Sequence, residues 1–173
     1  MRTIQVVILM IILLGVCISI ITLGLFKFYS YTPVNENEVT SVLGTYKSSS
    51  YELTSKSTYE LKIKLMEYEA TFYIWSVPLK SIKKESLNTL TNGEKVNIQI
   101  LTADLEHLNN SNKHIIVYGF TSNKHAYLKL DDVNYQQKEN SKLGFIISIV
   151  FSVALLFMLI FIYSTTKRLK RKK

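Results

Sequence analysis

Two long apolar runs constrain this chain more than any other feature of its sequence. Residues 3 to 26 and residues 143 to 166 carry no charged side chain, and each run is 24 residues long. About 20 apolar residues in a helix are enough to cross the hydrocarbon core of a bilayer. The sequence therefore predicts two transmembrane helices on either side of a more polar middle.

The first run has two interpretations, a cleaved signal peptide or a signal anchor that stays in place. Its apolar core is longer than the ~7–15 residues of a signal peptide, and no alanine before Ala70 supplies an A-x-A cleavage site. Cys17 resembles a lipoprotein acceptor only weakly, since Val16 precedes it. We expect a signal anchor with a buried, inert thiol.

The formal charge of +8 is concentrated at one end of the chain. Residues 27 to 142 hold 14 lysines against 13 acidic residues, so the middle is almost neutral. A nucleic-acid-binding domain would be expected to carry its basic residues on its own surface, so we expect no nucleic acid partner. The excess lies in the tail, at Lys167, Arg168, Lys170, Arg171, Lys172 and Lys173.

The basic tail predicts the orientation of both spans. Cytoplasmic loops carry an excess of lysine and arginine, so the C-terminus is expected in the cytoplasm of an integral membrane protein. Two spans return the N-terminus to the same side and leave residues 28–142 extracytoplasmic. Membrane lipid is thus an expected partner, and binding of the tail to anionic head groups is a further alternative.

Small residues recur at four-residue spacing on both apolar runs. They are Gly15 and Ser19 on the first run, and Gly144, Ser148 and Ser152 on the second. Such stripes let helix backbones approach closely, so the two helices are expected to pack together or to support a homo-oligomer. The alternative is that small residues are simply common in spans.

The middle of the chain shows the period of β-strands. Apolar and polar residues alternate over 59–65, 70–75 and 95–100, and the short segment between the first two predicts a hairpin. A second hairpin is expected from 114–120 and 125–130, an earlier strand near 41–47, and an imperfect helix over 79–90. Asp131 or Asp132 is expected to begin a helix that leads into the second span.

Five or six short strands with one apolar face must close or form a sandwich to bury that face. The expected fold is a small, partly open β-barrel of OB or SH3-like kind between two transmembrane helices. The expected boundaries are 1–27 for the anchor, 28–40 for a linker, 41–135 for the β domain, 136–142 for a second linker, 143–166 for the second span and 167–173 for the tail.

Few residues suggest catalysis or metal binding. The sequence lacks G-x-S-x-G, H-E-x-x-H and C-x-x-C, and its one cysteine lies in an apolar run. His107, His114 and His125, with Asp104 and Glu106 nearby, would need to converge to hold zinc, and their spacing matches no metal signature. We therefore expect surface histidines, no catalytic residue, no metal and no cofactor.

Tyrosine is abundant in the middle of the chain. A tyrosine has an apolar ring and a polar tip and suits a binding surface, although ordinary strand propensity explains the same enrichment. The tyrosines between the two apolar runs include Tyr46, Tyr51, Tyr59, Tyr68, Tyr73, Tyr118, Tyr127 and Tyr135.

The order of parts resembles bacterial two-span envelope proteins with small β ectodomains. The shared pattern is a signal anchor, a β domain, a hairpin, and a second span with a basic tail. Within the β domain the pattern includes Leu87, Leu90, Gly93, Val96, Ile98 and Ile100. The resemblance implies an envelope location and a β-barrel domain, and it implies no catalytic residues.

Three functions are compatible with these features. The first is a non-enzymatic, membrane-anchored ectodomain that binds or scaffolds a protein partner in the cell envelope, for example by strand addition to an open sheet edge. The second is a regulatory or protective subunit of a larger membrane complex that acts through its spans. The third is an extracytoplasmic hydrolase or metal-binding domain.

Overall fold

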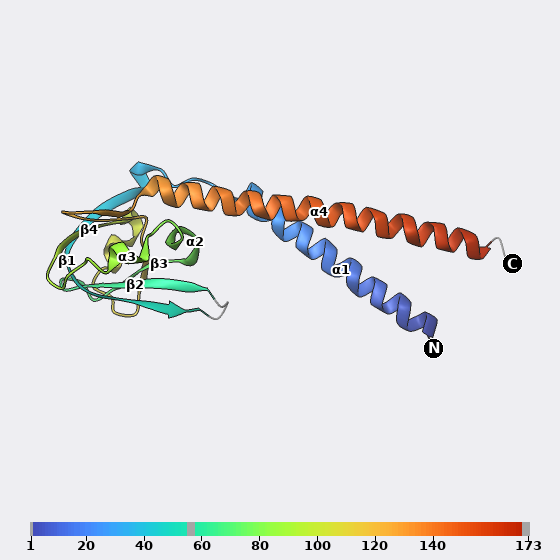
Figure 1. Cartoon of the computed structure of the whole chain (residues 1–173), viewed down its shortest axis with the longest axis horizontal. Coiled ribbons are helices and arrows are strands. Elements are labelled where there is room, and N and C mark those ends of the chain that lie inside the picture. Colours follow the sequence, from blue (N-terminus) through green and yellow to red (C-terminus); the bar gives the residue numbers. More distant parts are fainter. Residues whose placement is uncertain (1, 55–57, 171–173) are drawn as a thin grey trace. The chain divides into compact units, whose positions relative to one another are not determined.

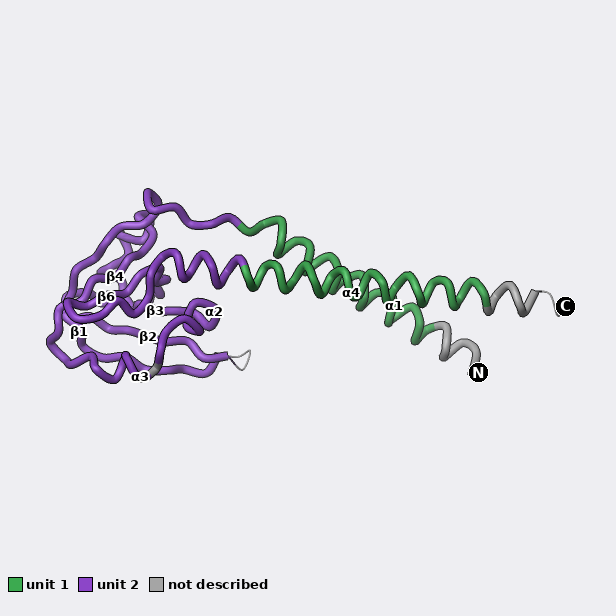
Figure 2. The backbone as a smooth tube through the Cα atoms, turned by 45° about the horizontal axis from the view of Figure 1, so that its top comes forward, with its two compact units in different colours: residues 1–31, 139–173 green, residues 32–138 purple. Residues whose placement is uncertain are grey.

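The computed structural model describes residues 2–54 and 58–170 of the chain. Its contacts divide the chain into two compact units. Residues 1–31 and 139–173 make up the first, and residues 32–138 make up the second (Figure 2). The first unit is helical and the second is built mainly from β-strands (Figure 1).

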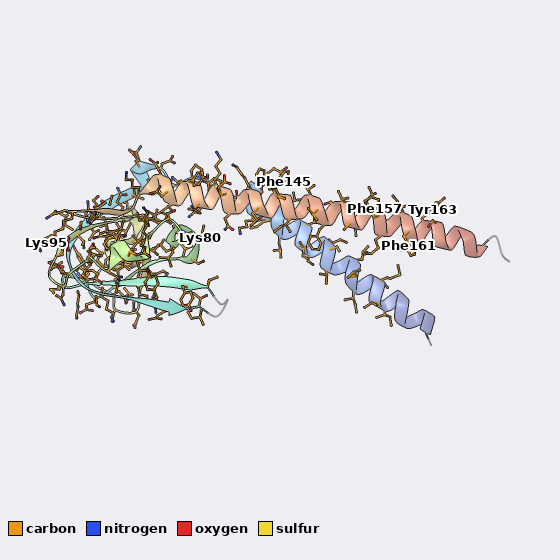
Figure 3. The ribbon with its side chains drawn as sticks, viewed as in Figure 1. Lys80, Lys95, Phe145, Phe157, Phe161 and Tyr163 are labelled. Carbon is orange, nitrogen blue, oxygen red and sulfur yellow. The ribbon has the colours of Figure 1, made fainter. Side chains whose placement is uncertain are left out.

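Two long helices supply the helical unit. Helix α1 runs from Arg2 to Tyr29, and helix α4 runs from Leu130 to Lys170. Within the described residues, Ile8–Tyr29 and Leu130–Ser164 are long and apolar enough to cross a membrane. Phe157 and Phe161 project from α4 and are largely exposed (Figure 3). The prediction of two helices that are long and apolar enough to span a bilayer is therefore confirmed.

Helix α4 begins where the sequence predicts a helix start. Its first turn contains Asp131 and Asp132, whose negative charges favour a helix N-terminus. The helix then continues without a break into the second apolar run. Residues 136–142, expected to be a linker, are helical in the structure.

The β unit contains one seven-stranded mixed sheet in the order β5-β3-β2-β1-β4-β6-β7. The strands are β1 Val39–Leu53, β2 Tyr59–Leu65, β3 Thr71–Ile74, β4 Lys95–Leu101, β5 His114–Ile116, β6 Gly119–Ser122 and β7 Ala126–Leu128. The short helices are η1 Glu36–Glu38, α2 Ser76–Leu79, α3 Lys84–Leu87 and η2 Thr102–His107.

Strand β1 connects the two halves of this sheet. Its first part, Val39 to Thr45, pairs with β4, and its second part, Tyr46 to Leu53, pairs with β2. A register irregularity between Tyr46 and Ser48 separates the two parts. A bulge of this kind bends a strand, so one strand can serve both halves. Strands β5 and β7 remain as edges, and the sheet is not a closed barrel.

The predicted strands over 59–65, 70–75 and 95–100 are confirmed as β2, β3 and β4, and β2 and β3 form the expected antiparallel hairpin. The single strand predicted over 114–120 is wrong. The chain divides at Val117 and Tyr118, so that β5 pairs in parallel with β3 while β6 pairs with β4 and β7. The helix predicted over 79–90 forms only the separate turns α2 and α3.

One hydrophobic core holds the β unit together. It is formed by the alternating positions of the strands, with Ile63, Phe72, Ile98 and Phe120 completely buried. Each such side chain contributes about 1.5–3 kcal/mol relative to an exposed one. The alternation in the sequence therefore identified the buried face correctly.

Candidate functional site

An open groove of about 520 Å³ lies on the outer face of the sheet. Its floor comes from β4 and β6, which lie side by side and present Asn97, Gln99, Gly119 and Thr121. These residues alternate with the buried Val96, Ile98 and Phe120, so they face away from the core. Its walls include Val39, Glu36 of η1, and Leu128, Lys129, Leu130 and Asp131 at the β7–α4 junction.

Two carboxamides form the centre of the floor. Asn97 lies opposite Thr121, and Gln99 lies opposite Gly119. A Cβ atom added to Gly119 would overlap the Gln99 side chain, so this position requires a glycine if Gln99 is to lie across β6. The sheet therefore positions both amides on the same surface, two residues apart on one strand.

Asn97 has an unsatisfied side-chain oxygen. Its Nδ2 lies 3.4 Å from Ser41 Oγ, whereas its buried Oδ1 has no hydrogen-bond partner. Buried polar atoms without a partner are uncommon and costly in folded proteins. One end of this amide therefore lacks a partner.

Hydrogen bonds fix the chain next to the groove. Asn35 N–H donates to Glu38 Oε2 across η1 at 2.9 Å, and Thr102 Oγ1 donates to the Glu38 carbonyl at 3.1 Å. Asn134 Nδ2 donates to the Val34 carbonyl at 2.8 Å, while Val34 N–H donates to Asn134 Oδ1 at 3.0 Å. One asparagine on α4 thus satisfies both backbone groups of a residue 100 positions earlier in the chain.

This arrangement suits hydrogen bonding better than apolar contact. A carboxamide offers both a donor and an acceptor, which matches the N–H and C=O groups of a peptide. Glu36 and Asp131 add carboxylates and Lys129 adds an ammonium group at the walls. The groove can therefore hold a polar, extended segment, with its carboxylates available to basic side chains.

Charge and burial affect two other groups of the β unit. Burial raises the pKa of Tyr118, and the charges of Asp104 and Glu38 raise it further, so the phenol is neutral at pH 7.

Hydrogen bonds shift the pKa of Glu67 in the opposite direction. Glu67 accepts hydrogen bonds from the hydroxyl of Thr45 at 2.5 Å and from the backbone N–H of Thr45 at 2.6 Å. These bonds, together with one from Lys95, lower the pKa of Glu67 to about 2.

The helical unit shows which of the predicted small residues pack. Ser148 is buried, and its hydroxyl donates to the Ile21 carbonyl of α1 at 3.1 Å and to the Gly144 carbonyl at 3.0 Å. The close approach on α1 is at Gly24, where an added Cβ atom would overlap Ser148 Oγ and the Gly144 carbonyl. Phe28 stacks on Phe145 with ring centroids 4.6 Å apart.

The other predicted packing residues have different surroundings. Gly15 has no atom within 4 Å of an added Cβ, and Ser19 bonds back to the Gly15 carbonyl of its own helix. Ser152 likewise bonds to the Ser148 carbonyl of its own helix. In the structure, Gly144 and Ser148 of α4 contact α1 at Ile21 and Gly24.

The basic residues predicted to set membrane orientation lie at the chain end. The backbone positions of Lys167, Arg168 and Lys170 belong to the last turns of α4. Arg171, Lys172 and Lys173 lie outside the described residues.

The histidines lie at separate places in the β unit. The His107 ring is 3.5 Å from the Glu106 carboxylate, the His114 ring contacts Tyr73, and the His125 ring contacts Tyr127. Across residues 2–54 and 58–170, no group of three or more histidine, cysteine, aspartate or glutamate side chains is placed to hold a metal ion.

Sequence reasoning missed the groove residues. Asn97 and Gln99 occupy the polar positions of a well-predicted strand, where they resemble ordinary solvent-facing residues. Their spacing of two residues was a usable signal, because it places both amides on one face. The pairing with Gly119 and Thr121 depends on strand order, which the sequence does not show.

No protein-family model, curated protein or solved structure matches this chain.

Proposed function

We propose that this chain is a membrane-anchored protein of the cell envelope whose β domain binds a protein partner and catalyses no reaction. The observation that carries the proposal is the groove on the outer face of the sheet. It offers the carboxamides of Asn97 and Gln99 on one surface and carboxylates at the walls. The backbone amides of an extended partner segment could hydrogen-bond with these groups.

The anchoring part of the proposal is supported by the exposure of the helical unit. Apolar side chains such as Leu9, Phe26, Leu156 and Phe161 are more than half exposed on α1 and α4. Side chains of this kind on a soluble domain would form a large apolar surface in water, which is unfavourable. Lipid around the two helices removes that cost.

We further propose that the bent sheet is a partly open barrel of OB or SH3-like kind. The support is that β1 pairs with both halves of the sheet and that one continuous core lies inside them. In this proposal both termini are cytoplasmic and residues 28–142 are extracytoplasmic, because the six basic residues of the tail favour the inner side.

Orientation is tested with a reporter that fluoresces only in the cytoplasm. Fusion after Lys173 is expected to give signal, and insertion at Asn110, in the turn after η2, is expected to give none. The opposite pattern contradicts the topology. Recovery of the full chain in the soluble fraction without detergent contradicts anchoring altogether.

The binding site is tested by photocrosslinking in intact membranes. A photoreactive residue at Thr121, on the groove floor, is expected to give a discrete protein adduct that Gln99→Ala reduces. The matched control is Met66, which is exposed in the β2–β3 loop away from the groove. Equal adducts at both positions, or an adduct insensitive to Gln99→Ala, would contradict a groove-specific partner.

A further inference from the structure

A second hollow, of about 190 Å³, lies on the part of the sheet formed by β1, β2 and β3. It is separate from the groove, whose floor comes from β4 and β6. Polar and charged residues make up its whole lining, and we call it the serine–lysine hollow. They are Ser48, Ser49, Ser50, Glu52, Lys62, Lys64 and Thr71.

Strand pairing brings hydroxyl and ammonium groups together on the outer face of this part of the sheet. Lys62 and Lys64 lie at the outward positions of β2, between completely or almost completely buried apolar residues. In the antiparallel pairing with β1, Ser50 lies opposite Lys62 and Ser48 lies opposite Lys64. Thr71 begins β3, on the other side of β2. Hydroxyl groups therefore flank the lysines from both neighbouring strands.

The run of three serines in β1 leaves hydroxyl groups that can bind a ligand. Strands favour β-branched and aromatic residues, so consecutive serines are not explained by strand propensity. The Ser49 hydroxyl lies 2.7 Å from the hydroxyl of Tyr46 and is already paired. Within residues 2–54 and 58–170, the side chains of Ser48, Ser50 and Thr71 have no hydrogen-bond partner.

The two lysines of the hollow differ in their charge partners. Lys62 Nζ lies 2.6 Å from Glu52 Oε2, so its charge is neutralised. Lys64 forms no ion pair with any residue that the structure describes. Ser48 and Glu52 are about 13 Å apart along β1. An anion is therefore favoured at the end of the hollow that holds Lys64, Ser48 and Thr71, away from the carboxylate.

The surroundings of Lys64 also carry an excess of positive charge. Lys64 borders a neighbouring hollow together with Lys47, Glu67 and Glu69. The Glu67 carboxylate lies 3.3 Å from the ammonium of Lys95, so its charge is already matched. Lys47 and Lys64 then share one remaining carboxylate, that of Glu69. The local field thus favours an anionic ligand over a cationic one.

We propose that the serine–lysine hollow binds the phosphate group of a small soluble molecule at its Lys64 end. A phosphate group carried on an ester has three strong acceptor oxygens. The hydroxyls of Ser48 and Thr71 and the ammonium of Lys64 supply donors of matching number, and lysine binds phosphate as a point charge. A carboxylate has only two oxygens, and the wholly polar lining offers no surface to an acyl chain.

Titration calorimetry on the full chain in a neutral detergent tests the site. The probes are inorganic phosphate and glycerol phosphate, each at constant ionic strength. Both should bind, and Lys64→Gln should weaken binding about tenfold or more, because a charge-assisted hydrogen bond is lost. Lys124→Gln removes the same charge from the β6–β7 turn and should keep the wild-type affinity. No binding by wild type, or equal affinities in the two variants, would overturn the proposal.

A serine variant separates a built site from general attraction between charges. Ser48→Ala keeps every charge and removes one donor, so it should weaken phosphate binding about threefold to tenfold. Ser111→Ala, at an exposed position before β5, is the matched control and should bind as wild type does. Unchanged affinity in Ser48→Ala would show that phosphate is attracted to surface charge only, which contradicts the proposal. The altered side chains are all exposed, so the variants should remain folded.

The source of the phosphate is tested with micelles that contain an anionic phospholipid. If these micelles bind in a manner that depends on Lys64 and the two soluble phosphates do not, the occupant is a lipid head group and the proposal is wrong. The proposal goes beyond the proposed function, because it concerns another surface and a small ligand. The groove crosslink at Thr121 should be unchanged in Lys64→Gln, so the two proposals can fail independently.

Discussion

The helical unit and the β unit use the same apolar side chains in opposite ways. In the β unit, Leu61 and Ile63 are completely buried in one core. In the helical unit, Leu9 and Leu156 are more than half exposed, and α1 and α4 bury a contact around Gly24 and Ser148. The β unit therefore excludes water from its interior, whereas the helical unit presents its apolar surface outward.

On the proposed membrane anchoring, two different forces hold the units. Burial of apolar area from water stabilises the β unit. With lipid around α1 and α4, as proposed, that force is absent between the helices, and close packing of small residues and interhelical hydrogen bonds would replace it. Gly24, Gly144 and Ser148 provide both. Each unit should then be sensitive to a different kind of substitution.

The largest effect is expected from Ile63→Asp. An unpaired carboxylate in the core costs several kcal/mol, which approaches the whole stability of a small domain of about 5–15 kcal/mol. Thermal unfolding of the β unit should lose its cooperative transition. The control is Lys64→Asp, at the exposed neighbouring position on the other face. A cooperative melt in Ile63→Asp would show that the assignment of faces is wrong.

A smaller effect is expected from Gly24→Leu, which should separate α1 from α4. Its side chain would overlap Ser148 and the Gly144 backbone, and overpacking of this kind costs about 1–3 kcal/mol. Gly15→Leu is the matched control, because an added Cβ there meets no atom. The measurement is crosslinking between cysteines at positions 28 and 145 in detergent. Equal loss in both variants would contradict the packing through Gly24.

Asn134→Ala is expected to weaken the β unit by about 1–2 kcal/mol, since two hydrogen bonds to Val34 are lost. The denaturant concentration at the midpoint of unfolding should fall, while the packing of the core in the folded state stays the same. Asn88→Ala, on an exposed position after α3, serves as the control and should leave the midpoint unchanged. If Asn134→Ala and Asn88→Ala unfold at the same denaturant concentration, the two bonds to Val34 do not contribute to the stability of the β unit.

The smallest effect is expected from Glu67→Gln, and it should depend on pH. The pKa of Glu67 is lowered from 4.5 to about 2, so its ionised form stabilises the fold above about pH 4.5, and this contribution is lost as the pH falls toward 2. The carboxylate is 38% exposed, so about 1 kcal/mol or less is expected at pH 7.

Chemical denaturation at pH 7 and at pH 2.5 measures this difference directly. Wild type and Glu67→Gln should differ in stability at pH 7 and converge at the lower pH. Asn88→Ala, at an exposed position away from Glu67 and its hydrogen-bond partners, corrects for general acid effects. A gap between wild type and Glu67→Gln that stays constant with pH would show that the ionised carboxylate is not the stabilising form.

Much of the fold was predictable because it depends on local periodicity. The alternation over 59–65 and 95–100 identified β2 and β4 and their buried faces, and the apolar runs identified α1 and α4. The stretch 114–120 was not predictable in the same way, because its sequence, HIIVYGF, is one continuous run of residues that favour a strand. Only pairing with β3 on one side and β4 on the other divides it.

The sequence by itself determined where apolar side chains are needed, which residues could span a membrane, and which face of each clear strand is buried. The periodicity of side chains is a local property that can be read directly from the order of residues in the sequence. The tertiary structure alone decided the strand order, the groove at Asn97 and Gln99, and the contact at Gly24. Each of these joins residues far apart in the chain, and their proximity depends on the packing of the whole unit, which local periodicity does not encode.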